Sequence, residues 1–158
     1  VYTVLHAGGK FGGEGYKVID VCGRNIAIMV GDDLSQLYEL DKEADFVVSI
    51  NARRYGKGLL SYRQEMLRRL TYTEGRNVVF VNQVGGSGDI VFDGTSGVMG
   101  ADGNLILLTK SFEEDFGLYD TEANYPPFQM PDEFFRHDRT EQLYRAFTIL
   151  KNEPYHHE

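Results

Sequence analysis

Two hydrophobic periodicities alternate through the middle of the chain. Four short segments carry the apolar patterns of β-strands, with residues of Val, Ile and Phe concentrated in each. Where the apolar run is nearly continuous, as in Ile26–Val30, it is typical of a strand that is buried on both faces. The predicted strands are Tyr16–Val21, Ile26–Val30, Phe46–Ile50 and Asn77–Asn82.

Helical spacing appears between these strands. Asp32–Ala44 places leucines at helical intervals after two acidic residues, which favour a helix N-terminus. Leu59–Thr73 has an apolar face formed by Leu59, Met66, Leu67 and Leu70, with charged residues, Arg63 among them, around it. The order β-α-β-α-β predicts the α/β fold class.

A different pattern follows residue 89. Ile90–Asp93, Thr95–Met99 and Leu105–Thr109 are predicted to be strands of a meander, and Phe116–Asp120 to add a last strand. Four prolines lie between residues 126 and 154, and those at 126, 127 and 131 favour a linker before a terminal helix over Arg139–Lys151.

Composition narrows the classes of function. Of 158 residues, 42% are hydrophobic and 25% are charged, which is a globular composition. The formal net charge of −8 disfavours nucleic acid and anionic membranes as partners. With one cysteine, no apolar run of about 20 residues and no visible signal peptide, the default location is the reducing cytoplasm, and no metal site is predicted.

Cys22 is the first candidate nucleophile because it is the single thiol. A reactive cysteine needs a nearby base or a helix N-terminus to lower its pKa. Cys22 lies in a predicted hairpin turn, Cys22–Asn25, so a structural role is favoured.

The stretch Asn82–Gly94 carries the first resemblance to a family. It reads Asn-Gln-Val-Gly-Gly-Ser-Gly-Asp-Ile-Val-Phe-Asp-Gly, and Ala101–Gly103, Ser111–Asp115, Lys57–Arg69 and Asp138–Leu150 continue the match in order. Residues 17–150 thereby resemble the glutaminase domain of glutamine-dependent NAD⁺ synthetases.

This resemblance implies a nitrilase-type amidohydrolase, an α-β-β-α sandwich, here partial and followed by a C-terminal helix. It implies that glutamine is hydrolysed by a Glu-Lys-Cys triad and that ammonia passes to a separate synthetase domain. No cofactor is implied for this chain, since ATP and Mg²⁺ belong to that other domain.

The sequence departs from the family at the nucleophile. Gly31, directly after a predicted strand, stands where the family has its cysteine, and no segment matches the family's Glu and Lys. Arg53-Arg54 replaces a small Ser-Pro pair. Asp32, Arg53, Tyr55 and Gln83 are the candidate pocket residues, and the chain is expected not to hydrolyse glutamine.

A second resemblance covers residues 2–17. Thr-Val-Leu-His-Ala-Gly-Gly-Lys-Phe at residues 3–11 resembles the ATP-lid segment of the DNA gyrase B subunit. The phosphate-binding loop that follows in that family is absent from this sequence.

Three functional hypotheses remain at this stage: an inactive glutaminase part, a non-catalytic scaffold or interaction module, and a gyrase-type ATP-binding fragment. The expected divisions are a Gly-rich segment 1–16, a core 17–120, a linker 121–137, and a helix with its tail 138–158. Expected partners are a synthetase domain or a second copy of the chain, with glutamine as a candidate ligand.

Overall fold

A six-stranded mixed sheet is the central element of the computed structural model, which describes residues 16–31, 44–126, 128 and 139–152. Its strand order is β1-β2-β3-β4-β7-β8, and β5 and β6 form a separate two-stranded hairpin. The strands of the large sheet are β1 (Tyr16–Val21), β2 (Arg24–Val30), β3 (Phe46–Asn51), β4 (Asn77–Asn82), β7 (Gly97–Met99) and β8 (Leu105–Leu108).

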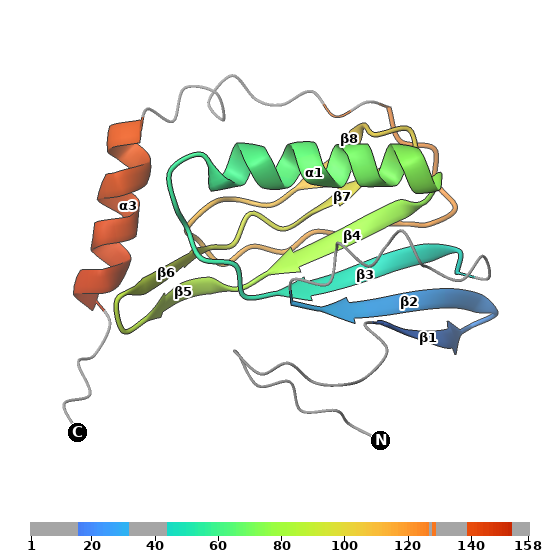
Figure 1. The fold of residues 1–158 in the computed structure, drawn as a ribbon, viewed down its shortest axis with the longest axis horizontal. Helices are drawn as coiled ribbons and strands as arrows, with labels where there is room; N and C mark the ends of the chain where they lie inside the picture. Colours follow the sequence, from blue (N-terminus) through green and yellow to red (C-terminus); the bar gives the residue numbers. More distant parts are fainter. Residues whose placement is uncertain (1–15, 32–43, 127, 129–138, 153–158) are drawn as a thin grey trace.

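The middle of the sheet is parallel and its edges are antiparallel. β2, β3 and β4 run in one direction, so that their carboxyl ends lie together at the left of Figure 1. β1 pairs antiparallel with β2 through a tight turn at Cys22 and Gly23, both at positive φ. The predicted hairpin turn at Cys22 is thereby confirmed, and its side chain is exposed.

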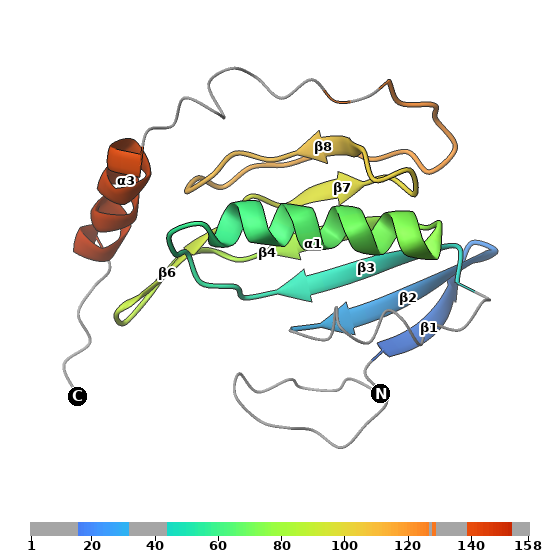
Figure 2. The same ribbon diagram turned by 45° about the horizontal axis from the view of Figure 1, so that its top comes forward.

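Helix α1 (Leu59–Glu74) packs on one face of this sheet, over β4 and β7 (Figures 1 and 2). Alternate residues of the strands point at it and form the core with Leu67 and Leu70. The core residues from the sheet are Ala27, Met29, Val47, Val78, Phe80 and Met99. The helix ends at Gly75, whose left-handed conformation (φ 65°) lets its N–H bond the carbonyl of Thr71.

The other face of the sheet remains partly open at its carboxyl end. Ile50 and Val81 are register partners on β3 and β4, and they are 44% and 42% exposed. They alternate with Ser49 and Phe80, which are buried on the side of α1. Two large apolar side chains therefore lie side by side in solvent.

Helix α3 (Arg139–Asn152) stands beside the hairpin of β5 (Val84–Ser87) and β6 (Ile90–Asp93), apart from α1 (Figure 1). Ala146 is its buried residue, while Leu143, Tyr144 and Phe147 are exposed. The predicted terminal helix is confirmed to within one residue.

The expected strand Phe116–Asp120 is wrong. The Asp115 carboxylate accepts the backbone N–H groups of Lys110 and Phe116, each at 2.9 Å, and turns the chain away from the sheet ladder. Gly117 then packs on the side chain of Leu107 instead of pairing with its strand. The predicted helix Asp32–Ala44 falls almost wholly outside the described residues.

Candidate functional site

The carboxyl ends of the three parallel strands bring three residues into one row on the side of α1. Val30 is in register with Ile50, and Asn51 is in register with Asn82. Gly31, one residue beyond Val30, therefore lies beside Asn51, which lies beside Asn82. Neighbouring strands are about 4.8 Å apart, so the row Gly31–Asn51–Asn82 spans the end of three strands, the usual location of binding sites in α/β sheets.

Gly31 ends β2 in a conformation that suits glycine. Its φ is +79°, and its N–H donates to the carbonyl of Ile50 at 2.8 Å. Among the described residues, no atom lies within 4 Å of where a Cβ of Gly31 would be, apart from its neighbours in the chain. Within that part of the chain, the position where the family resemblance implies a nucleophilic cysteine is thus unfilled, and its backbone is bonded to β3.

Asn82 is the most heavily bonded side chain of the row. Its Oδ1 accepts the N–H of Arg53 at 2.8 Å, and its Nδ2 lies 3.2 Å from the carbonyl of Arg53. The same Nδ2 is within 3.1 Å of Asp93 Oδ1 and 3.0 Å of the Gly94 carbonyl. One amide therefore ties the loop after β3 to the end of the hairpin.

Behind Asn82 lies a buried ion pair. Arg63 of α1 donates to Asp93 through both terminal nitrogens, at 3.2 and 2.9 Å, and the side chains are only 5% and 4% exposed. The guanidinium also lies over the ring of Phe80, 5.0 Å from its centroid. Thr95 donates to Asp93 from the other side. This cluster anchors helix and hairpin to the end of β4.

Asn51, the middle residue of the row, is bonded on one side only. Its Nδ2 donates to Ser49 Oγ at 2.8 Å, while its buried Oδ1 has no hydrogen-bond partner among the described residues. Buried side-chain oxygens are normally paired, so Asn51 and Asn82 differ sharply although they are neighbours in register.

The candidate pocket residues occupy the loops at this same edge. Arg53 is half-buried and Tyr55 follows it, its N–H donating to the carbonyl of Val91 at 2.6 Å. The Tyr55 ring packs edge-on against Phe112, with centroids 5.0 Å apart. Burial, and then the charge of Asp93, raise the pKa of Tyr55 above its ordinary 10.0. Gln83 is exposed just after β4, and Asp32 lies outside the described residues.

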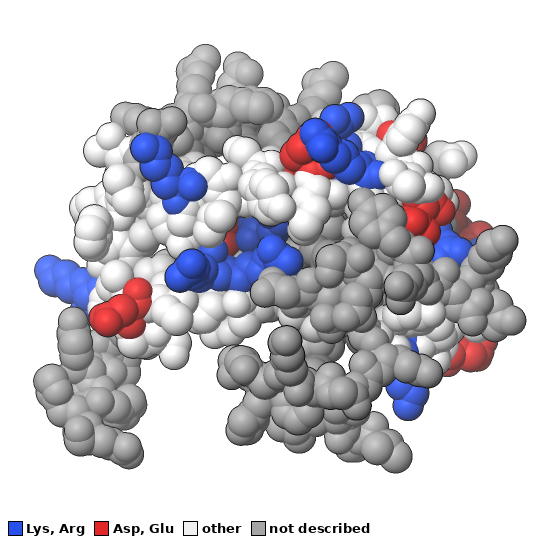
Figure 3. Space-filling model, viewed as in Figure 1, with Lys and Arg blue, Asp and Glu red and all other residues white. Residues whose placement is uncertain are grey.

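Cationic side chains collect over the β3–α1 loop, as the blue group near the centre of Figure 3 shows. In the β3–α1 loop, Arg54 and Lys57 are exposed and Arg53 is partly covered. Their positive charge lies at the edge of the sheet where the parallel strands end.

The Gly-rich stretch after β4 forms one strand of a hairpin, although its glycines favour a loop. Val84–Ser87 is a strand, β5, and pairs with β6 in register, so that only Gly88 and Asp89 form the turn. Gly85 and Gly88 have positive φ values of 121° and 57°, whereas Gly86 has not. The stretch forms a hairpin, and the positive φ in its turn favours glycine at position 88.

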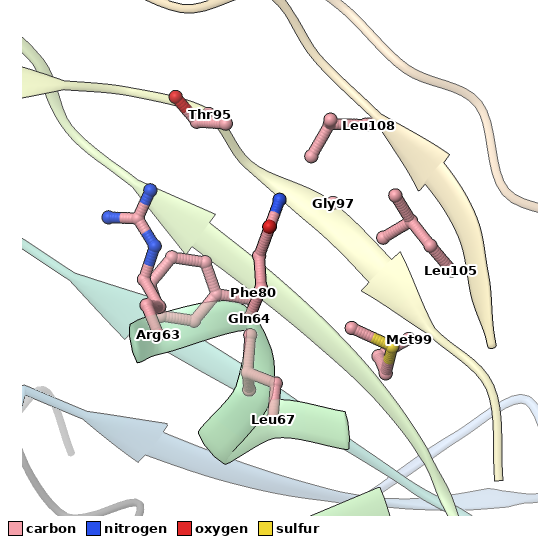
Figure 4. Close-up of a pocket in the computed structure, with 9 residues that line it drawn as sticks. All are labelled: Arg63, Gln64, Leu67, Phe80, Thr95, Gly97, Met99, Leu105 and Leu108. Atoms are coloured by element: carbon pink, nitrogen blue, oxygen red, sulfur yellow. The ribbon is translucent and has the colours of Figure 1, made fainter. Parts of the chain in front are cut away.

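A small cavity lies under α1, against β7 and β8 (Figure 4). Its volume is about 20 Å³, enough for a single water molecule. Most of its walls are apolar side chains such as Leu67, Met99 and Leu108, and the buried Nε2 of Gln64 has no partner among the described residues. The cavity adjoins the ion-pair cluster behind Asn82, because Arg63, Phe80 and Thr95 also line it.

Within residues 16–31, 44–126 and 139–152, no three His, Cys, Asp or Glu side chains are grouped so that they could hold a metal ion. None of the described helices is long and apolar enough to cross a membrane.

Sequence reasoning missed the residues that make most of the contacts. Arg63 was assigned to the charged surface of its helix, yet it is buried, because Asp93 supplies its counter-charge. Asn51 and Asn82 were not singled out. A repeated pattern could have revealed them, since β3 and β4 both end on Asn after an apolar run.

Comparison with known proteins finds similarity to one group of enzymes, the glutamine-dependent NAD(+) synthetases. No family model matches the chain. The glutamine-dependent NAD(+) synthetase of Acinetobacter baylyi is 24% identical over 143 residues, which cover 87% of this chain and 26% of that protein. A solved glutamine-dependent NAD+ synthetase from Acinetobacter baumannii superposes with a TM-score of 0.65 at 27% identity, over 87% of this chain and 27% of that one.

The fold is also found outside the synthetases. A carbon-nitrogen hydrolase from Helicobacter pylori G27 superposes with a TM-score of 0.59 at 21% identity, over 65% of this chain and 42% of that one. The described fold is therefore that of the nitrilase-like carbon-nitrogen hydrolases, in its mixed α/β form.

Within that class, the chain is homologous to the nitrilase-like glutaminase part of glutamine-dependent NAD⁺ synthetases, as the resemblance over residues 17–150 predicted. It spans about a quarter of the length of the two Acinetobacter synthetases. The gyrase-like stretch lies almost entirely outside the described residues and stays a prediction.

Proposed function

We propose that this chain is the glutaminase-type part of a protein related to glutamine-dependent NAD⁺ synthetases, and that it does not hydrolyse glutamine by a cysteine mechanism. The observation that carries the proposal is Gly31. It occupies the end of β2, in register beside Asn51, where the family resemblance implies the nucleophile.

A glycine cannot supply a nucleophile, and the single thiol of the sequence does not replace it. Cys22 lies in the β1–β2 turn, at the opposite end of β2 from Gly31, and it is exposed. Loss of one member of a catalytic triad costs several orders of magnitude in rate. No cofactor is proposed for this part; ATP and Mg²⁺ are assigned to the synthetase domain.

The test measures ammonia released from glutamine. We expect none above the background from the natural sequence or from Cys22→Ala, and Gly31→Cys reports whether the open position accepts a thiol. Turnover by the natural sequence that disappears in Cys22→Ala would contradict the proposal. Turnover that survives in Cys22→Ala would contradict it as well, because it would require another nucleophile.

A second candidate, a non-catalytic interaction module, is favoured by Ile50 and Val81. Two adjacent apolar side chains exposed on a sheet face are typical of a surface that another chain covers. We propose self-association or contact with a synthetase domain there. Light scattering on the natural sequence and on Ile50→Lys tests self-association, and a monomer in both cases would exclude it.

A further inference from the structure

Helix α3 has a small apolar contact with the rest of the protein. It lies beside the β5–β6 hairpin and apart from α1 (Figure 1). Among the side chains of α3 that the structure describes, Ala146 is the one that is buried. The larger apolar side chains are exposed or half-buried, namely Leu143, Tyr144, Phe147, Ile149 and Leu150. A securely packed helix normally turns such side chains toward the core, so apolar burial holds α3 only weakly.

An ion pair connects α3 to a segment far away in the sequence. Arg145 Nη1 donates to Glu113 Oε1 at 3.1 Å, and the two residues are 32 positions apart. Within the helix, Arg145 also pairs with Glu141 at 2.9 Å. Lys110 Nζ lies 3.7 Å from the other carboxylate oxygen of Glu113. Arg145 therefore joins α3 to the loop that follows β8.

That loop is itself fixed to the body of the protein. The N–H of Phe112 donates to the carbonyl of Asp93 at 2.9 Å, next to the buried ion pair with Arg63. The carboxylate of Asp115 accepts the N–H of Lys110 at 2.9 Å. Glu113 is thus presented by a segment with its own hydrogen bonds, and α3 is the partner that can move.

The Arg145–Glu113 pair is open to solvent and ions. The two side chains are 33% and 51% exposed. Exposed ion pairs are weak, and dissolved salt screens them further. A released α3 would have 14 residues, a length at which an isolated helix is marginal in water. Release of α3 should therefore appear as faster exchange of its backbone amide hydrogens.

We propose that α3 is a detachable helix, held against the β5–β6 hairpin by the Arg145–Glu113 ion pair as a salt-sensitive contact. Detachment uncovers the face of α3 around Ala146 together with the side of the hairpin that it covers. Neither member of the ion pair belongs to the strand-end row, so the inference does not depend on the proposed function.

The experiment measures amide hydrogen exchange by mass spectrometry in the whole 158-residue chain, with α1 as the internal reference. Raising NaCl from about 0.05 M to about 0.5 M should speed exchange in α3 about two- to fivefold and leave α1 unchanged. Glu113→Gln should speed exchange in α3 at low salt and remove most of its salt dependence. Glu114→Gln is the matched control, because Glu114 is the exposed neighbour and its substitution changes the net charge equally.

Three results would overturn the inference: exchange in α3 that does not respond to salt, a Glu113→Gln variant that keeps the full salt dependence, or equal effects of Glu113→Gln and Glu114→Gln. Should Glu113→Gln fail to fold, Arg145→Gln takes its place, because it removes the same ion pair from the side of the helix.

Discussion

The two ends of the strand-end row are built differently. At the end of β4, Asn82 is bonded to Asp93 of β6, and Arg63 neutralises the buried charge of Asp93. At the ends of β2 and β3, Gly31 has no side chain, and Asn51 Oδ1 has no partner among the described residues.

The difference shows that hydrogen bonding is unevenly distributed along one row of strand ends. The contacts around Asn82 hold α1, the β3 loop and the hairpin together, and they are complete within the chain. At the β2–β3 end, Asn51 Oδ1 has no partner among the described residues, yet Gly31 is bonded to Ile50 through the backbone in spite of its positive φ.

The largest effect on stability is expected from removing the Arg63–Asp93 ion pair near the end of β4. Asp93→Asn leaves the Arg63 guanidinium buried without a counter-charge, which should lower the free energy of unfolding by about 3–5 kcal/mol. Urea denaturation measures it, with the exposed Asp89→Asn as control. A loss below about 1 kcal/mol in Asp93→Asn would mean that water reaches Arg63.

The register partners Asn82 and Asn51 give the next contrast. Asn82→Ala leaves the buried groups that bond to its amide without partners. We expect the free energy of unfolding to fall by about 2–3 kcal/mol. Asn51→Ala removes one hydrogen bond together with an orphaned oxygen, so its cost should stay below about 1 kcal/mol. Equal losses in denaturation would show that the two ends are not as different as their contacts indicate.

The open space at Gly31 can be tested against a second glycine. Gly31 and Gly23 share a φ of +79°, and no atom of the described residues lies within 4 Å of their Cβ positions. Gly31→Ala and Gly23→Ala should each cost about 1–2 kcal/mol, from the left-handed backbone alone. A clearly larger loss for Gly31→Ala would reveal a steric neighbour at the presumed substrate position.

The smallest effect concerns the pKa of Tyr55, which lies in the loop between β3 and α1. Phe112→Ala removes the ring against which Tyr55 is buried, so the pKa of Tyr55 should fall toward 10.0. NMR of labelled tyrosines measures this pKa, with the exposed Tyr62 as reference. Because the folded-state pKa is raised, the associated stability is complete below pH 10.0 and is lost as the pH rises through the folded-state value. An unchanged pKa in Phe112→Ala would assign the shift to other neighbours.

Local sequence patterns predicted most of the helices and strands, because the formation of each depends mainly on the residues within it. β4 and β6 have the predicted bounds, and α1 exceeds its prediction by one residue. The failures came where a distant or competing contact prevailed. The Asp115 carboxylate turned an apolar stretch away from the sheet, and pairing with β6 made a strand of glycines whose composition favours a loop.

For the site, the sequence by itself determined that position 31 has no nucleophile, since residue identity needs no structure. It also placed Gly31, Arg53 and Gln83 after strands, and parallel strands bring their carboxyl ends to one edge. Only the tertiary structure decided that Arg63 is buried on Asp93, that Asn82 is saturated and that Asn51 is not. The reason is physical: the burial of a polar group and the supply of its partners depend on which segments meet across the sheet, and the partners of Arg63 and Asn82 lie 30 and 11 or more residues away along the chain.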